Sequence, residues 1–107
     1  MKRFKQTDHG DRGWFIGHWA NALIKTEQFE IAHGFNPAGD HSPNHFHKEA
    51  LEISLITSGK AEVNGEIFNA GEGFIMEPGD RCECHYIEDT YTLVVKTPSV
   101  TNDKYYI

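Results

Sequence analysis

The sequence of 107 residues has no long apolar run and almost no clustered positive charge. No stretch approaches the roughly 18 consecutive apolar residues of a membrane-spanning helix. The only basic run is the opening MKRFK, which is too short for a nucleic-acid footprint, and the formal net charge is −6. The N-terminus also lacks the apolar core of a secretory signal. We therefore expect a cytoplasmic protein that binds neither membranes nor nucleic acid.

Cysteine is scarce, with only Cys82 and Cys84 in the chain. Two residues that are two positions apart on a strand point the same way and are poorly placed for a disulfide bond. A lone C-x-C also lacks the second ligand pair of a structural zinc site. Neither a disulfide framework nor a zinc finger is expected.

Apolar residues at helical spacing are missing, and short alternating runs separated by turn residues take their place. Residues 29–35 and 51–57 alternate in the way of strands, and Asn64-Gly65 is typical of a two-residue type I′ hairpin turn between 61–63 and 66–68. Strands this short and closely spaced favour an antiparallel sandwich or small barrel. The sequence predicts a single all-β domain with few or no helices.

Histidine is abundant, with seven residues in the chain. On a strand His45 and His47 point to the same face, so their imidazoles can converge on one metal ion. Glu52 lies an odd number of residues from His47, so it joins them only if the chain bends through residues 48–50. Taken alone, the H-x-H pair is equally consistent with two surface histidines at the end of a strand.

The wider spacing resembles the first motif of the cupin superfamily. Gly39, five residues, His45-x-His47, four residues, Glu52, six residues and Gly59 match that motif at every position. The resemblance implies a small double-stranded β-barrel of the jelly-roll type in which His45, His47 and Glu52 bind a divalent transition metal. It also implies one domain over residues 1–107, with the barrel core at about 27–97, an N-terminal aromatic arm at 1–26 and a tail at 98–107.

The second cupin motif is altered. Gly71 and Gly79 are in place, but Glu77 stands where the motif has its proline, Cys82 where it has histidine and Tyr86 where it has asparagine. Three completions of the site are open: water, a Cys82 thiolate, or His85, which has the wrong strand parity unless a bulge intervenes. The metal is expected to be iron, zinc, nickel or manganese.

The remaining site predictions concern the cavity. His41, before the motif, and Tyr86 are candidate catalytic acids or bases, and four residues are expected to line the cavity: His33, Ser54, Cys84 and Tyr91. The resemblance implies a small-molecule ligand, with dioxygenase-type or sugar isomerase or epimerase chemistry. The alternative is a non-catalytic metal-binding or ligand-binding barrel that serves as a sensor or accessory module. The aromatic arm and the YYI ending predict a homodimer.

Overall fold

The computed structural model describes all residues from Met1 to Ile107 as eleven strands and one turn of 3-10 helix, η1 (Gln6–Asp8). None of its elements is a helix of the length and apolar character needed to span a membrane. The strands are β1 (Trp14–Gly17), β2 (Ile24–Lys25), β3 (Glu30–Asn36), β4 (His41–His47), β5 (Leu51–Ser58), β6 (Lys60–Val63), β7 (Glu66–Asn69), β8 (Gly73–Met76), β9 (Cys82–Tyr86), β10 (Thr90–Thr97) and β11 (Lys104–Tyr106).

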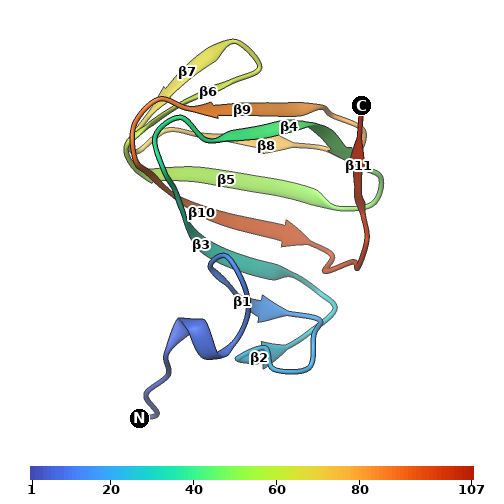
Figure 1. Cartoon of the computed structure of the whole chain (residues 1–107). Helices are drawn as coiled ribbons and strands as arrows, with labels where there is room; N and C mark the ends of the chain where they lie inside the picture. Colours follow the sequence, from blue (N-terminus) through green and yellow to red (C-terminus); the bar gives the residue numbers. More distant parts are fainter.

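The strands form two sheets that face each other (Figure 1). The larger sheet has six strands in the order β2-β1-β3-β10-β5-β8, and the smaller has five in the order β11-β4-β9-β6-β7. Every neighbouring pair is antiparallel except β1 and β2. The expected all-β, antiparallel architecture is therefore confirmed.

The two ends of the chain are built into the sheets. In the N-terminal arm, β1 pairs with β3 and extends the larger sheet, and β2 continues it. In the C-terminal tail, β11 pairs with β4 and forms an edge of the smaller sheet (Figure 1). Of these two segments, the C-terminal one lies directly beside β4, the strand that carries His45 and His47.

The hairpin between β6 and β7 turns at the predicted place. Val63 pairs with Glu66, and the two residues between them, Asn64 and Gly65, have φ angles of 49° and 85°. A type I′ turn requires positive φ at both of its central residues, which asparagine and glycine tolerate best. The prediction of this hairpin is confirmed.

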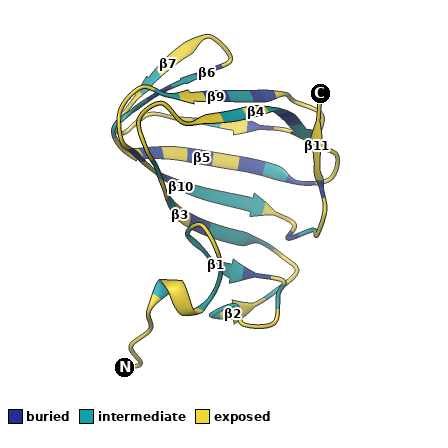
Figure 2. Cartoon of the chain, viewed as in Figure 1, coloured by how far each residue is buried: buried dark blue, intermediate teal, exposed yellow.

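The first part of β5, in the larger sheet, turns polar residues inward and apolar residues outward. On β5, Glu52, Ser54 and Ile56 are buried, whereas Ile53 and Leu55 are 44% and 37% exposed (Figure 2). The apolar core gathers instead around β6, β8 and β9, and its buried members are Ile56, Ala61, Val63, Met76, Cys82 and Cys84. One part of the barrel interior is consequently apolar, and the part beside β4 and the start of β5 is polar.

The outer face of the larger sheet is apolar and open. Its exposed members are Phe35, Ile53, Leu55, Ile75 and Tyr91. Contiguous exposed apolar surface of this kind is typical of protein–protein contacts. The homodimer stays a prediction.

The two glycines that bound the histidine motif allow a matched test of the fold. Gly59 and Gly39 have φ angles of 94° and 89°, which disfavour any residue with a Cβ. A Cβ at Gly59 would collide with the backbone of Asp89 and with Thr90, whereas one at Gly39 would meet open space. We expect Gly39→Ala to lower the free energy of unfolding by about 1 kcal/mol, and Gly59→Ala to lower it further. Urea denaturation measures both, and equal losses would contradict the steric argument.

Candidate metal centre

His45, His47 and Glu52 all line the cavity inside the barrel. The two histidines come from β4 of the smaller sheet and Glu52 from β5 of the larger sheet, and their exposed fractions are only 6%, 3% and 9%. The imidazole centroids of His45 and His47 are 5.5 Å apart. His47 Nε2 lies 3.3 Å from Glu52 Oε1. The three side chains therefore bridge the two sheets across the cavity.

The short connection between β4 and β5 orients Glu52 into the cavity. Here the chain passes from the smaller to the larger sheet, so the alternation of side chains restarts and the expected bend is present. The Asp103 carboxylate holds this turn: it accepts hydrogen bonds from the backbone N–H groups of Lys48 at 3.0 Å, Glu49 at 3.1 Å and Ala50 at 2.9 Å. Burial by itself would raise the pKa of Asp103, but these bonds outweigh it and keep the pKa below its usual range.

Both imidazoles have their Nδ1 atoms engaged by the backbone. His47 Nδ1 is 2.9 Å from the Asp103 carbonyl oxygen, and His45 Nδ1 is 2.8 Å from that of Pro43. A carbonyl oxygen only accepts, so each Nδ1 carries a proton, and in the neutral ring Nε2 then keeps a lone pair. His47 Nε2 is buried and has no hydrogen bond of acceptable geometry, although Glu52 is near. Such an orphaned nitrogen fits a metal ion, because a buried polar atom is costly unless something binds it.

The charges of the site also suit a metal ion. Burial is the largest influence on His45 and lowers its pKa, so its imidazole is neutral at neutral pH. Burial would raise the pKa of Glu52, but the adjacent His47 and the charge of Lys96 outweigh it and leave the pKa lowered. Neutral imidazole and ionised carboxylate are the forms that bind metals.

A fourth ligand could come from Cys82, which pairs with His45 across β4 and β9. Burial raises the pKa of the Cys82 thiol to about 12, and the nearby Glu52 and Cys84 add to the effect. The thiol is therefore protonated in the absence of a metal. His85 alternates with the buried Cys84 and is exposed on the opposite face of β9, so it does not reach this position. Water and Cys82 remain the two completions of the site.

The cavity around these residues has a volume of about 640 Å³. Ser54, Cys84 and Tyr86 line it, in the positions that the alternation on β5 and β9 predicts. Ser54 Oγ donates a hydrogen bond to Glu52 Oε2 at 3.2 Å and so helps to orient the carboxylate. Burial raises the pKa of both Cys84 and Tyr86, so these side chains are protonated at neutral pH.

Two residues predicted to line the cavity lie elsewhere. His33 and Tyr91 stack on each other with ring centroids 5.4 Å apart on the exposed outer face of the larger sheet. The reason is strand parity: β3 and β10 turn Ala32 and Thr92 inward, so their larger neighbours point outward. For these two residues the prediction is wrong.

His41 does not turn toward the metal ligands. It lies at the rim of the cavity, where its Nε2 is 3.0 Å from Glu83 Oε2 and its ring stacks on that of His85. Its predicted part in catalysis would require it to leave these contacts.

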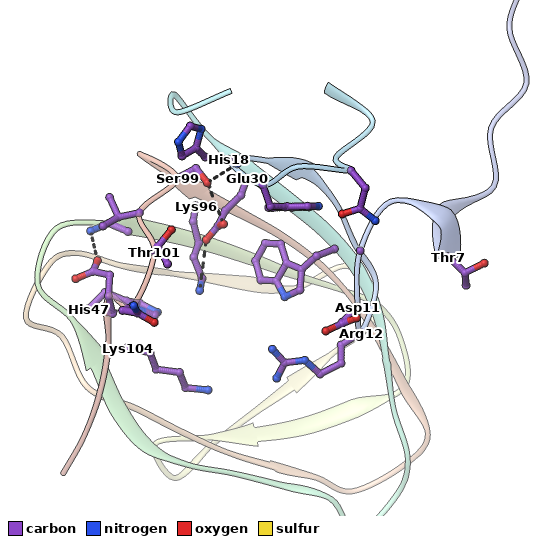
Figure 3. Close-up of a pocket in the computed structure, with 18 residues that line it drawn as sticks. Thr7, Asp11, Arg12, His18, Glu30, His47, Lys96, Ser99, Thr101 and Lys104 are labelled. Carbon is purple, nitrogen blue, oxygen red and sulfur yellow. Dashed lines mark hydrogen bonds and ion pairs between the residues drawn. The ribbon is translucent and has the colours of Figure 1, made fainter. Parts of the chain in front are cut away.

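A second hollow of about 710 Å³ lies between the N-terminal arm and the C-terminal tail (Figure 3). It shares five lining residues with the cavity: Arg12, Trp14, His47, Lys96 and Lys104. Lys96 Nζ lies 3.7 Å from Glu30 Oε1 and 4.0 Å from Glu52 Oε1, and 5.0 Å from the centre of the Trp14 ring. The hollow therefore opens onto the candidate metal ligands through a mouth that carries three cationic side chains.

Sequence reasoning missed these cationic residues. Lys96 could have been found, since it follows the inward-facing Thr92 and Val94 at even spacing on β10. Arg12 and Lys104 come from opposite ends of the chain, and nothing in their local sequence indicates that they face each other.

Comparison with known proteins establishes the fold. No family model matches the chain, and no curated protein matches it in sequence. KdgF from Halomonas sp. matches with a TM-score of 0.67 at 18% identity, covering 72% of this chain and 74% of that one. A protein with a double-stranded β-helix domain from Klebsiella pneumoniae gives a TM-score of 0.67 at 18% identity, covering 92% and 85%. The chain has the double-stranded β-helix fold of the cupins.

Larger cupins match over one part of their length. Oxalate decarboxylase from Bacillus subtilis gives a TM-score of 0.65 at 18% identity, and the match covers 77% of this chain but 24% of that one. The cupin fold expected from the first motif is thus confirmed.

We expect Asp103→Ala to destabilise the protein strongly, because three backbone N–H groups of the turn lose a charged acceptor. The loss in the free energy of unfolding should be about 3 kcal/mol, and Asp103→Asn, which keeps one acceptor oxygen, should lose less. Asp80→Ala is a matched control, since Asp80 accepts one backbone N–H, from Glu77, in an exposed turn. If Asp103→Ala unfolds in urea no more easily than Asp80→Ala, the carboxylate does not hold the turn.

Proposed function

We propose that the protein is a metal-dependent cupin that acts on a small anionic molecule. His45, His47 and Glu52 hold a divalent transition metal: iron, zinc, nickel or manganese. The observation that carries the proposal is the buried Nε2 of His47, which has no good hydrogen-bond partner and lies 3.3 Å from a carboxylate oxygen of Glu52. The match of both histidines and Glu52 to the first cupin motif supports the same ligand set.

When bound, the metal would supply a Lewis-acid or redox centre with open coordination positions. The chain supplies the surroundings. Backbone carbonyls hold the tautomers of both histidines, and Ser54 orients Glu52. Cys82 and Tyr86 face the same cavity as protonated groups, so either can donate a hydrogen bond to a bound molecule. Tyr86, as a hydrogen-bond donor that lines the cavity, is the better placed of the two candidate catalytic residues.

The charge of the mouth points to an anionic ligand. Arg12 and Lys104 form no ion pair within the chain, and in Figure 3 their side chains point toward one another across the hollow. Lys96 lies further in, shared between Glu30 and Glu52. Two unpaired cations at the mouth of a protein with a net charge of −6 favour a carboxylate or similar anion. The chemistry we propose is dioxygenase-type or isomerase-type.

A non-catalytic binding barrel is the second candidate. It is favoured by the protonation of Cys82, Cys84 and Tyr86, since none of these cavity groups is ionised and ready to act as a base at neutral pH. A protein of this kind would bind the metal and the anion without converting it. Retention of bound ligand without turnover would favour this candidate.

Elemental analysis tests the metal site. Untagged protein purified without chelator should contain close to one transition-metal ion per chain from this site, and the His45→Ala/His47→Ala double variant should lose it. His33→Ala is the matched control, because His33 is exposed on the outer face of the other sheet. If the double variant keeps the metal content of the parent protein after incubation with Fe(II), Zn(II), Ni(II) or Mn(II), the ligand assignment is wrong.

Oxalate, a small dicarboxylate, is a suitable probe for the cationic mouth. We expect oxalate to raise the melting temperature of the metal-loaded protein, and Arg12→Ala or Lys104→Ala to weaken its binding about tenfold, equivalent to ~1.4 kcal/mol. Lys25→Ala, on the exposed edge strand β2, removes the same charge away from the mouth and should leave binding unchanged. Equal weakening in all three variants would mean that net charge, and not the mouth, attracts the anion.

A further inference from the structure

Two more histidines and a glutamate gather on the outer face of the smaller sheet. His41 belongs to β4, and Glu83 and His85 belong to β9, where they alternate with the buried Cys82 and Cys84. Because successive side chains of a strand point to opposite faces, Glu83 and His85 project away from the cavity. This outer cluster is therefore separate from His45, His47 and Glu52.

Strand register brings the outer cluster together. His41 and His85 are direct partners in the antiparallel pairing of β4 and β9. Their rings stack with centroids 4.2 Å apart and planes inclined by 12°. His41 Nε2 is 3.0 Å from Glu83 Oε2, and the ligand atoms of all three residues lie within 4.8 Å of one another. Glu83 and His85, both on β9, thus flank the imidazole of His41 on β4.

This geometry is close to what a transition metal needs. Bonds of about 2.0–2.1 Å in a tetrahedral zinc site place neighbouring ligand atoms about 3.3 Å apart. His41 and Glu83 already have such a separation, and His85 is exposed, so its ring can rotate toward them. Glu62 on β6 pairs with His85 and offers a second carboxylate on the same face.

We propose that His41, Glu83 and His85 form a second transition-metal site on the outside of the barrel. Two imidazoles and a carboxylate suit Zn²⁺, Ni²⁺ or Cu²⁺ and do not suit Mg²⁺, which prefers oxygen ligands and water. The site joins β4 to β9, so an ion bound here clamps the strand that carries the cavity histidines. An ion that binds only the folded chain stabilises it, by an amount that grows with the logarithm of the free ion concentration once that exceeds Kd.

Strand β4 can serve both sites because its pairing with β9 shifts register between Ser42 and His45. Before the shift His41 faces outward, and after it His45 and His47 face inward. The ordinary alternative is an exposed ion pair between His41 and Glu83 stacked on His85, with no ion bound. The two readings differ in how many metal ions the chain holds.

Isothermal titration calorimetry of untagged, metal-stripped protein with Zn²⁺ at neutral pH distinguishes the metal site from the ion pair without a bound ion. The parent protein should bind one ion more per chain than the His41→Ala/His85→Ala variant, and Glu83→Gln should weaken the same site. His33→Ala, which removes an exposed histidine elsewhere, should match the parent, and Mg²⁺ should give no binding at this site. Equal Zn²⁺ stoichiometry in the parent and in the double variant would overturn the proposal. The difference of one ion holds whether or not the cavity site fills.

Proton NMR of the imidazoles provides an independent readout. Sub-stoichiometric Cu²⁺ should broaden the ring signals of His41 and His85 before those of the exposed His18 and His33. His41 and His85 lie on the surface, so replacing them should leave the fold intact. Unchanged ring signals of the other histidines would verify this. If the signals of all the exposed histidines broaden together, Cu²⁺ binds surface histidines non-specifically and the outer cluster is not a metal site.

Discussion

The structure depends on one anchored residue near the end of the chain. The Asp103 carboxylate accepts hydrogen bonds from the backbone N–H groups of Lys48, Glu49 and Ala50. The backbone carbonyl oxygen of the same residue accepts a hydrogen bond from His47 Nδ1. The turn thereby carries the chain from one sheet to the other at the point where Glu52 must enter the cavity. A single residue of the tail thus fixes both the path of the motif and the tautomer of one of its ligands.

The cavity has the polarity that metal chemistry requires because strand β5 of the larger sheet points polar side chains into the barrel. Glu52 and Ser54 face inward while Ile53 and Leu55 face solvent, so the buried volume beside β4 is filled by groups that bind ions. Burial keeps His45 neutral, and the nearby Lys96 helps to keep Glu52 charged. The apolar core around β6, β8 and β9 supplies the rigid part of the barrel that this polar region cannot provide.

The smaller sheet has histidine on both of its faces. His45 and His47 project into the cavity, and His41 and His85 stack on the outside. A shift in register between β4 and β9 separates the two groups along one strand. An ion bound on the outside would stiffen the backbone that positions the inner ligands, so the two proposed sites are mechanically connected.

Local patterns determined much of the architecture. The Asn64-Gly65 hairpin and the shared face of His45 and His47 follow from φ preferences and from the two-residue repeat of a strand, which neighbours in sequence decide. Alternation alone does not say which face is buried, and for that reason His33 and Tyr91 were placed wrongly in the cavity. Only the tertiary structure brought Arg12, Lys96 and Lys104 to one mouth and Glu83 beside His41, because these contacts join segments far apart in the chain.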